Sequence, residues 1–167
     1  MPFKLRPFVP EDAPSLAKYA NNLNVARNMS DLFPYPYTLQ NARDFIAMTG
    51  QHQPVRIFAI DINGEAVGAT GLHPLGDIFR KNAELGYWLG EPFWGQGIVP
   101  RVVGQMVEYG FEHFDITRIF ARPFGTNLAS QRVLEKAGFK LEARFEKTIF
   151  KRGEFLDELV YAVRREG

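Results

Sequence analysis

One stretch of the chain combines residue types suited to binding a phosphorylated ligand: Tyr87 to Val99, with glycines at positions 90, 95 and 97. A β-rich segment precedes these glycines, and a helical pattern begins near Ile98, so the first amide groups of that helix lack partners within it. Such amides carry partial positive charge, and glycines let a ligand approach the backbone closely. The stretch therefore predicts a pyrophosphate site built from main chain. An ordinary strand-to-helix turn is the alternative, and the glycines alone do not decide between the two.

The elements that must position this loop follow from the spacing of apolar residues. The pattern predicts helices that start at Pro10, run from Thr38 to Gly50, begin near Ile98, and run from Asn127 to Ala137. It predicts strands over Phe3–Phe8, Val55–Ile62, Glu65–Leu72, Ala83–Leu89, Arg118–Arg122, Phe139–Phe150 and Glu154–Val163. This order predicts a mixed sheet with helices on both faces rather than a regular repeat of strand and helix.

Several local signals support these boundaries. Asn63-Gly64 is the strongest short signal for a tight β-hairpin. Thr38 is suited to cap the helix that follows it, and Gly138 is suited to end another. Two prolines, Pro34 and Pro36, exclude a regular helix from the connection that contains them.

Composition excludes several classes of protein. The chain has 167 residues, no cysteine and a formal net charge of +1, which suits one domain without a disulfide scaffold or a cysteine nucleophile. Proteins that bind nucleic acid through its phosphates usually have a larger excess of basic over acidic residues than this chain has. The sequence has no apolar run long enough to span a membrane and no signal-peptide core, so we expect a cytoplasmic protein without a membrane partner. His52 and His113 lack companions at metal-ligand spacing, and no metal is expected.

Short motifs in order along the chain carry a more specific resemblance. They are Ala83–Leu89, Trp94-Gly-Gln-Gly-Ile98, Asn127-Leu-Ala-Ser130, Val133–Phe139 and Asp157–Tyr161, with weaker matches at Phe33–Tyr37 and Asn41–Asp44. Together they resemble the GNAT acyl-CoA acyltransferases, in particular the RimJ/RimL-type branch. The resemblance implies an α/β (α+β) GNAT fold with a mixed, mostly antiparallel sheet of about seven strands, in a single domain over residues 1–167. It also implies an acetyl-CoA-dependent N-acetyltransferase that transfers acetyl to a primary amine by direct attack.

The resemblance further implies which residues hold acetyl-CoA. The backbone amides of Gln96, Gly97, Ile98 and Val99 would bind the pyrophosphate, and Gly95 would leave room for it. The pantetheine arm would lie along Tyr87, Trp88 and Leu89, and the Leu89 amide would polarise the thioester carbonyl. Asn127 matches the asparagine that bonds the cofactor, although a plain helix cap would explain it too. The chain departs from the family at Trp94, Val99 and Pro100, where a basic or amide residue, a small residue and a hydroxyl residue are common.

Two residues are predicted to move protons. Glu84 precedes the pantetheine stretch and is the candidate base for the acceptor amine, with a solvated edge residue as the alternative and His73 as the runner-up. Leu134 stands where many relatives have a tyrosine that protonates the leaving thiolate. Ser130, one turn earlier, is therefore the candidate acid, with a solvated helix serine as the alternative and Tyr161 as the second choice.

The acceptor and the rival functions are less sharply defined. Tyr35 and Tyr37 lie where relatives shape the acceptor site, and loop aromatics packed on the core are the alternative. The acceptor is expected to be a protein N-terminus or a small amine, and a homodimer stays open. One rival function is a catalytically weak CoA-binding or sensor protein, suggested by Val99, Pro100 and Leu134. The other is a nucleotide-binding module that uses the same glycine loop.

Overall fold

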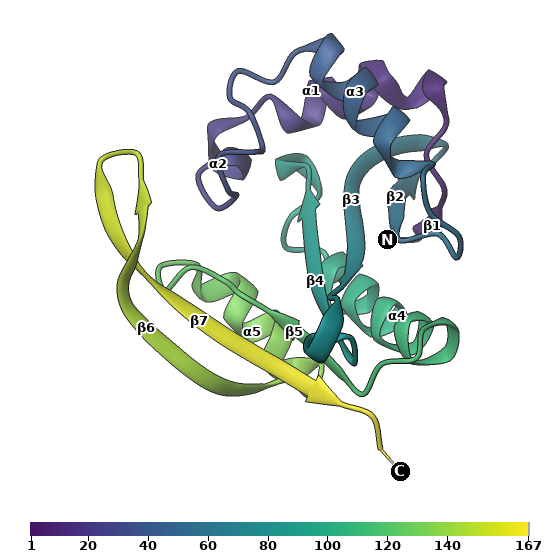
Figure 1. Ribbon diagram of the computed structural model, residues 1–167. Helices are drawn as coiled ribbons and strands as arrows, with labels where there is room; N and C mark the ends of the chain where they lie inside the picture. Colours follow the sequence, from purple (N-terminus) through teal and green to yellow (C-terminus); the bar gives the residue numbers. More distant parts are fainter. Residues whose placement is uncertain (167) are drawn as a thin grey trace. The chain divides into compact units, whose positions relative to one another are not determined.

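A computed structural model describes residues 1–166, and Figure 1 shows its helices and strands. The strands are β1 (Lys4–Arg6), β2 (Ile57–Ile62), β3 (Glu65–Pro74), β4 (Asn82–Leu89), β5 (Arg118–Ala121), β6 (Lys140–Lys151) and β7 (Glu154–Arg164). The helices are α1 (Ala13–Ala20), α2 (Leu23–Ala26), α3 (Leu39–Thr49), α4 (Ile98–His113) and α5 (Leu128–Lys136).

The described strands form one mixed sheet in the order β1-β2-β3-β4-β5-β7-β6. Pairing is antiparallel between β1 and β2, between β2 and β3, between β5 and β7, and between β6 and β7. Strand β4 pairs with β5 in parallel, and the register joins Asn82 to Arg118 and Glu84 to Phe120. The predicted mixed, mostly antiparallel sheet of about seven strands is confirmed.

The chain forms two compact units. The N-terminal unit comprises Met1–Gly71 and Tyr87–Ile98, and the C-terminal unit comprises Leu72–Gly86 and the residues from Val99 onward. In the N-terminal unit, the apolar faces of α1 and α3 are buried with residues that include Leu16, Ile46 and Trp88. In the C-terminal unit, α4 packs closely at Gly110, where a Cβ would lie only 2.7 Å from the Leu72 side chain.

The turn and helix-end residues predicted from the sequence lie at turns and helix ends in the structure. Asn63 and Gly64 both have positive φ, 54° and 85°, as the tight hairpin between β2 and β3 requires. The Thr38 side chain accepts a hydrogen bond from the Asn41 amide at the start of α3, and Gly138 has a φ of 89° just after α5. The predicted first strand was too long, since β1 covers only Lys4–Arg6. Helix α2 was not predicted: it begins after Asn22, whose side chain accepts from the Asn24 amide.

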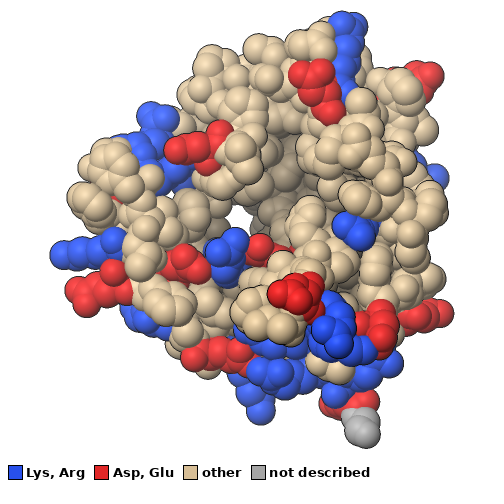
Figure 2. Space-filling model, viewed as in Figure 1, with Lys and Arg blue, Asp and Glu red and all other residues tan. Residues whose placement is uncertain are grey.

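Charged side chains of both signs alternate over the hairpin of β6 and β7, and Figure 2 shows this mixture on the face in view. Many of them are paired, as in the contacts of Arg144 with Asp157 at 2.6 Å and of Arg164 with Glu142 at 2.9 Å. In the part of the chain that the structure describes, no helix is both long enough and apolar enough to cross a membrane.

Candidate active site

The glycine loop is held in place where it leaves β4. The Gly90 amide donates to the Val67 carbonyl at 2.8 Å, and a 3-10 turn over Glu91–Phe93 follows. The indole N–H of Trp94 then donates to the Leu89 carbonyl at 2.7 Å. Trp94 therefore has a local structural role: its indole links the glycine loop to the end of β4.

The loop itself presents main chain to solvent. Gly95 and Gly97 have φ of 75° and 73°, a conformation that side-chain-bearing residues rarely adopt, and a Cβ at either position would meet no neighbouring atom. Gly95, Gln96 and Gly97 are exposed, whereas the Ile98 side chain is buried and anchors the first residue of α4. In proteins generally, a glycine turn before a helix can present amide groups to an anion.

The first turn of α4 contains a residue that cannot donate a backbone hydrogen bond. Val99 and Pro100 are its second and third residues, and both are half-buried. Proline has no amide hydrogen, so Pro100 offers no donor, although it suits the first turn of a helix. The residues before it, from Gln96 to Val99, each carry an amide hydrogen, and a Cβ at Gly95 or Gly97 would face open space.

Side chains from the first helices hold the start of this loop. The carboxylate of Glu91 accepts hydrogen bonds from the side-chain amides of Asn22 at 2.9 Å and Asn24 at 3.1 Å. The Asn22 and Asn24 amides hold the pKa of Glu91 below its usual value. The Tyr19 ring packs edge-on against Phe93, with the ring centroids 5.5 Å apart. The loop is therefore held by three neighbouring side chains within its own unit.

The two predicted acceptor tyrosines have different surroundings. Tyr37 is only 7% exposed, and its ring lies against Phe33, which contacts Trp88 in turn. Burial raises the pKa of Tyr37 to about 12. Its amide donates to the Asn21 side chain at 3.0 Å. This burial favours the packing alternative for Tyr37, whereas Tyr35, 49% exposed, is open to a ligand.

In the C-terminal unit, Glu84 is fully engaged by Arg122. One carboxylate oxygen of Glu84 accepts from Arg122 Nε at 2.7 Å, and the other accepts from Nη2 at 3.0 Å. A second carboxylate, that of Glu158 on β7, lies 3.7 Å from Nη1 of the same guanidinium. The contacts place the predicted base in a cluster of two carboxylates around one arginine.

The remaining predicted residues of this unit differ in their surroundings. The Asn127 side chain accepts from the Ser130 amide at 3.2 Å, so it caps α5. Tyr161, the second choice for the acid, is buried on β7, and burial raises the pKa of its hydroxyl. His73 is exposed near the end of β3. Residues 1–166 contain no cluster of three or more His, Cys, Asp or Glu side chains suited to a metal ion.

Sequence reasoning missed the residues that support the site. Arg122 lies 38 positions from Glu84, and Asn22 lies 69 positions from Glu91. No local pattern signals either contact, because an arginine after a strand and an asparagine between helices are ordinary surface residues. Only the pairing of β4 with β5 would have directed attention to Arg122.

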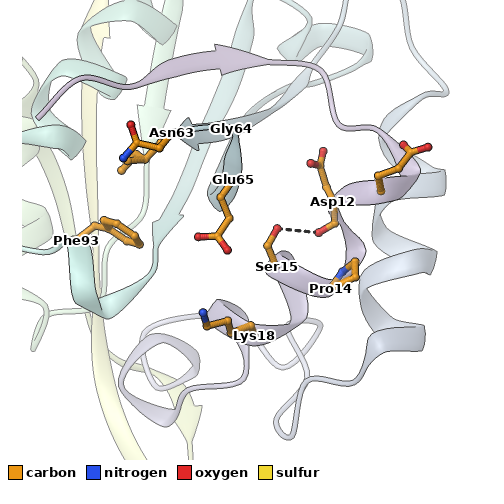
Figure 3. Close-up of a pocket in the computed structure, with 10 residues that line it drawn as sticks. Asp12, Pro14, Ser15, Lys18, Asn63, Gly64, Glu65 and Phe93 are labelled. Carbon is orange, nitrogen blue, oxygen red and sulfur yellow. Dashed lines mark hydrogen bonds between the residues drawn. The ribbon is translucent and has the colours of Figure 1, made fainter.

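A separate open hollow of about 630 Å³ lies in the N-terminal unit. Figure 3 shows Lys18, Glu65 and Phe93 around it, together with Ser15, whose hydroxyl donates to the Asp12 carbonyl at 3.1 Å. Tyr19 also donates to Glu65 at 2.7 Å. The ten residues that line the hollow include none of the predicted site residues, and charges of both signs border it.

Comparison with known proteins places these features in a family. The profile of the Acetyltransferase (GNAT) domain matches residues 3–140. The uncharacterized N-acetyltransferase YoaA of Bacillus subtilis (strain 168) is 34% identical over 99 residues, 59% of this chain and 55% of YoaA. The putative ribosomal N-acetyltransferase YdaF of the same strain is 30% identical over 101 residues, 60% of this chain and 55% of YdaF.

The chain thus matches just over half the length of each of these two relatives. Among solved structures, RimL, a ribosomal L7/L12 alpha-N-protein acetyltransferase in complex with coenzyme A, is similar with a TM-score of 0.85 at 24% identity. That match covers 97% of this chain and 93% of RimL, and it concerns the fold. Because the domain profile covers most of the sequence, the chain belongs to the GNAT acetyltransferase domain family.

Proposed function

We propose that residues 1–167 form one N-acetyltransferase domain that transfers acetyl from acetyl-CoA to a primary amine. The observation that carries the proposal is the exposed turn at Gly95 and Gly97, whose amides directly precede α4. Acetyl-CoA supplies an acetyl group activated as a thioester. The complexes of RimL with coenzyme A and of the acetyltransferase MccE with acetyl-CoA support this choice of donor.

Each predicted residue then has one task in binding. The amides of Gln96, Gly97, Ile98 and Val99 bind the pyrophosphate, and Gly95 leaves space for it. Tyr87, Trp88 and Leu89 carry the pantetheine arm along β4, and the Leu89 amide binds the oxyanion that forms at the carbonyl. Asn127 adds a side-chain donor to the cofactor.

The proton transfers fall to two further residues. The acceptor must be a neutral amine when it attacks, and Glu84 accepts its proton through water, because Arg122 occupies both carboxylate oxygens. The amine nitrogen forms a bond to the acetyl carbon, the carbon–sulfur bond breaks, and Ser130 gives a proton to the leaving thiolate. Tyr161 is the second candidate for that last step.

The acceptor belongs to one of two classes, protein N-termini or small amines. The names of YdaF and RimL support a ribosomal protein N-terminus as in the RimJ/RimL-type branch, and the name of the Escherichia coli relative, spermidine N(1)-acetyltransferase, supports a polyamine. Exposed Tyr35 is the candidate contact for the amine-bearing group. Buried Tyr37 holds the connection that contains both tyrosines. Cytoplasmic location and dimer formation stay predictions.

The test is an acetylation screen with purified protein, acetyl-CoA and a panel of N-terminal peptides, polyamines and other small amines. Release of free thiol and a mass increase of the acceptor are the expected results. Binding of coenzyme A without turnover of any amine would favour the sensor alternative. In a competition experiment, preference for ATP or NAD over acetyl-CoA would favour the nucleotide-binding alternative and contradict the proposal.

A further inference from the structure

Gly90 differs from the other two glycines of the loop. Its φ of −57° and ψ of 138° lie in a region that residues with side chains adopt freely, whereas Gly95 and Gly97 have positive φ. Backbone conformation therefore does not require a glycine at position 90. A Cβ there would lie 3.0 Å from Cδ1 of Tyr19 and 3.1 Å from its Cβ and Cγ. The glycine is needed because the Tyr19 side chain packs directly on the backbone at this point.

Tyr19 is held in turn by Glu65. Tyr19 lies on α1, and Glu65 is the first residue of β3. The Tyr19 hydroxyl donates to Glu65 Oε1 at 2.7 Å. This hydrogen bond raises the pKa of Tyr19 above its usual value, so the hydroxyl stays protonated and continues to donate near neutral pH. The bond to Glu65 thus fixes where the ring lies.

The Tyr19 ring also contacts the turn that leads into the glycine loop. Tyr19 and Phe93 pack edge-on with ring centroids 5.5 Å apart. Glu65 and Phe93 both border the hollow in Figure 3. The Phe93 amide donates to the Gly90 carbonyl at 3.0 Å, and the Gly90 amide donates to the Val67 carbonyl at 2.8 Å. Tyr19 therefore contacts both residues that are joined by the hydrogen bond within the turn.

From these contacts we infer that Tyr19 is a positioning residue for acetyl-CoA: its ring, held by Glu65, fixes where the chain leaves β4 at Gly90. The stretch proposed to carry the pantetheine arm ends immediately before Gly90, and the amides proposed to bind the pyrophosphate follow the turn. A loop that is already ordered binds its ligand at a lower entropic cost, so a looser turn lowers affinity. The link to acetyl-CoA rests on the proposed function, whereas the contacts of Tyr19 with the turn do not.

Amide hydrogen exchange of the full chain, followed by NMR without ligand, tests those contacts alone. Tyr19→Ala should speed the exchange of the Gly90 and Phe93 amides about fivefold, because the turn opens more often once the ring is gone. The Asp12 amide, which donates to the Val9 carbonyl at 3.0 Å in another 3-10 turn, is the internal control and should keep its rate. Unchanged rates at Gly90 and Phe93 would overturn the inference whatever the protein binds.

Calorimetry then measures the affinity for acetyl-CoA. Tyr19→Ala should weaken binding about tenfold, and Tyr19→Phe, which keeps the ring but loses the hydrogen bond, about threefold. Glu65→Ala should match Tyr19→Phe, and the two changes together should add little, because both remove the same bond. Tyr109→Phe removes the hydroxyl of a half-buried tyrosine on α4 and is the matched control, which should bind like wild type. Wild-type affinity in both Tyr19 variants would contradict the inference.

Gly90→Ala tests the direct contact between the ring and the backbone. The added Cβ must push against Tyr19, so acetyl-CoA affinity should fall severalfold in the otherwise unchanged chain. In a Tyr19→Ala chain, which lacks Cγ and Cδ1 at position 19, the same substitution should cost less. Equal losses in the two backgrounds would mean that the ring and the loop are not coupled.

Kinetics separates positioning from a mere loss of folded protein. With an acceptor from the acetylation screen, Tyr19→Phe should raise the KM for acetyl-CoA and leave the KM for the amine unchanged. A lower kcat with both KM values unchanged would indicate only less folded protein and would count against the inference. Faster exchange with wild-type affinity would do the same, since Tyr19 would then hold the turn without serving acetyl-CoA. If the wild-type chain binds no acetyl-CoA, the proposed function itself fails, and the exchange rates still decide whether Tyr19 holds the turn.

Discussion

Arg6 joins two buried carboxylates in the N-terminal unit. Its guanidinium binds Asp12 through two hydrogen bonds of 2.8 Å and Asp61 through one of 2.6 Å, and both aspartates are almost fully buried. Burial alone would raise the pKa of each aspartate. Hydrogen bonds from Arg6, together with the Val9 amide for Asp12 and the Gly64 amide for Asp61, outweigh burial and lower both pKa values.

We predict that Asp12→Asn lowers the free energy of unfolding by about 2 kcal/mol at pH 7, because the half-buried Arg6 keeps only one carboxylate. A lowered folded-state pKa means that the aspartates stabilise the fold above the unfolded value near 4, and that this contribution is lost as the pH falls below it. Urea unfolding between pH 7 and 3 should therefore show a smaller acid loss in the variant than in wild type. Asp115→Asn, at an exposed partner of Lys81, is the control and should match wild type.

At the scale of elements, β3 and the end of β4 approach each other through Gly68. A Cβ at Gly68 would lie 2.4 Å from the Trp88 carbonyl oxygen and 3.0 Å from the Leu89 Cα, and neither backbone atom can rotate away. We predict that Gly68→Ala costs about 2–3 kcal/mol of unfolding free energy, as overpacking typically does. Gly86→Ala is the matched control within a strand, because a Cβ there meets nothing and an alanine should be neutral or slightly stabilising. Equal unfolding midpoints in urea for the two variants would contradict this reading of Gly68.

The anchoring of the glycine loop makes a second prediction at this scale. Asn21 and Asn22 are neighbours between α1 and α2, yet one binds the Tyr37 amide and the other binds Glu91. Glu91→Ala removes the contacts to Asn22 and Asn24 and leaves the turn before Trp94 less ordered. Ordering that turn on binding would cost about 1 kcal/mol, so calorimetry should show acetyl-CoA affinity reduced roughly fivefold. Glu11→Ala changes an exposed glutamate in another 3-10 turn and should bind like wild type; the same loss in both variants would argue against the anchor.

For the whole molecule, turns and helix ends could be predicted from the sequence better than contacts between distant residues. Asn63-Gly64, Thr38 and Gly138 were predictable because each satisfies a local backbone requirement, positive φ or a free helix amide, that few residue types meet. Helix α2 was missed because it is a single turn, too short for apolar periodicity, and it depends on the Asn22 cap. The pairs Glu84–Arg122 and Asn22–Glu91 were missed because they form only after distant segments pack. The glycine loop could be predicted because its backbone requires glycine at particular positions. The residues that hold the loop could not be predicted, because no local requirement marks them in the sequence.

Ligand binding at the site should be measurable as a rise in the thermal stability of the whole chain. At 100 times its dissociation constant, a ligand that binds only the folded chain adds about 2.7 kcal/mol, which raises Tm by roughly 5–10 °C for a chain of this size. We therefore expect acetyl-CoA to raise Tm in a concentration-dependent way. Gly97→Ala should reduce that rise, because φ of 73° strains an alanine and moves the amides at the start of α4.

Gly64→Ala is the matched control, since φ there is also positive, at 85°, and a Cβ at either glycine meets open space. Both variants should lower Tm without ligand by a similar amount, since the strain is of the same kind. Only Gly97→Ala should lose part of the acetyl-CoA shift, because only its amides belong to the proposed pyrophosphate site. Equal acetyl-CoA shifts in the two variants, measured by differential scanning fluorimetry, would mean that the ligand is held elsewhere in the chain.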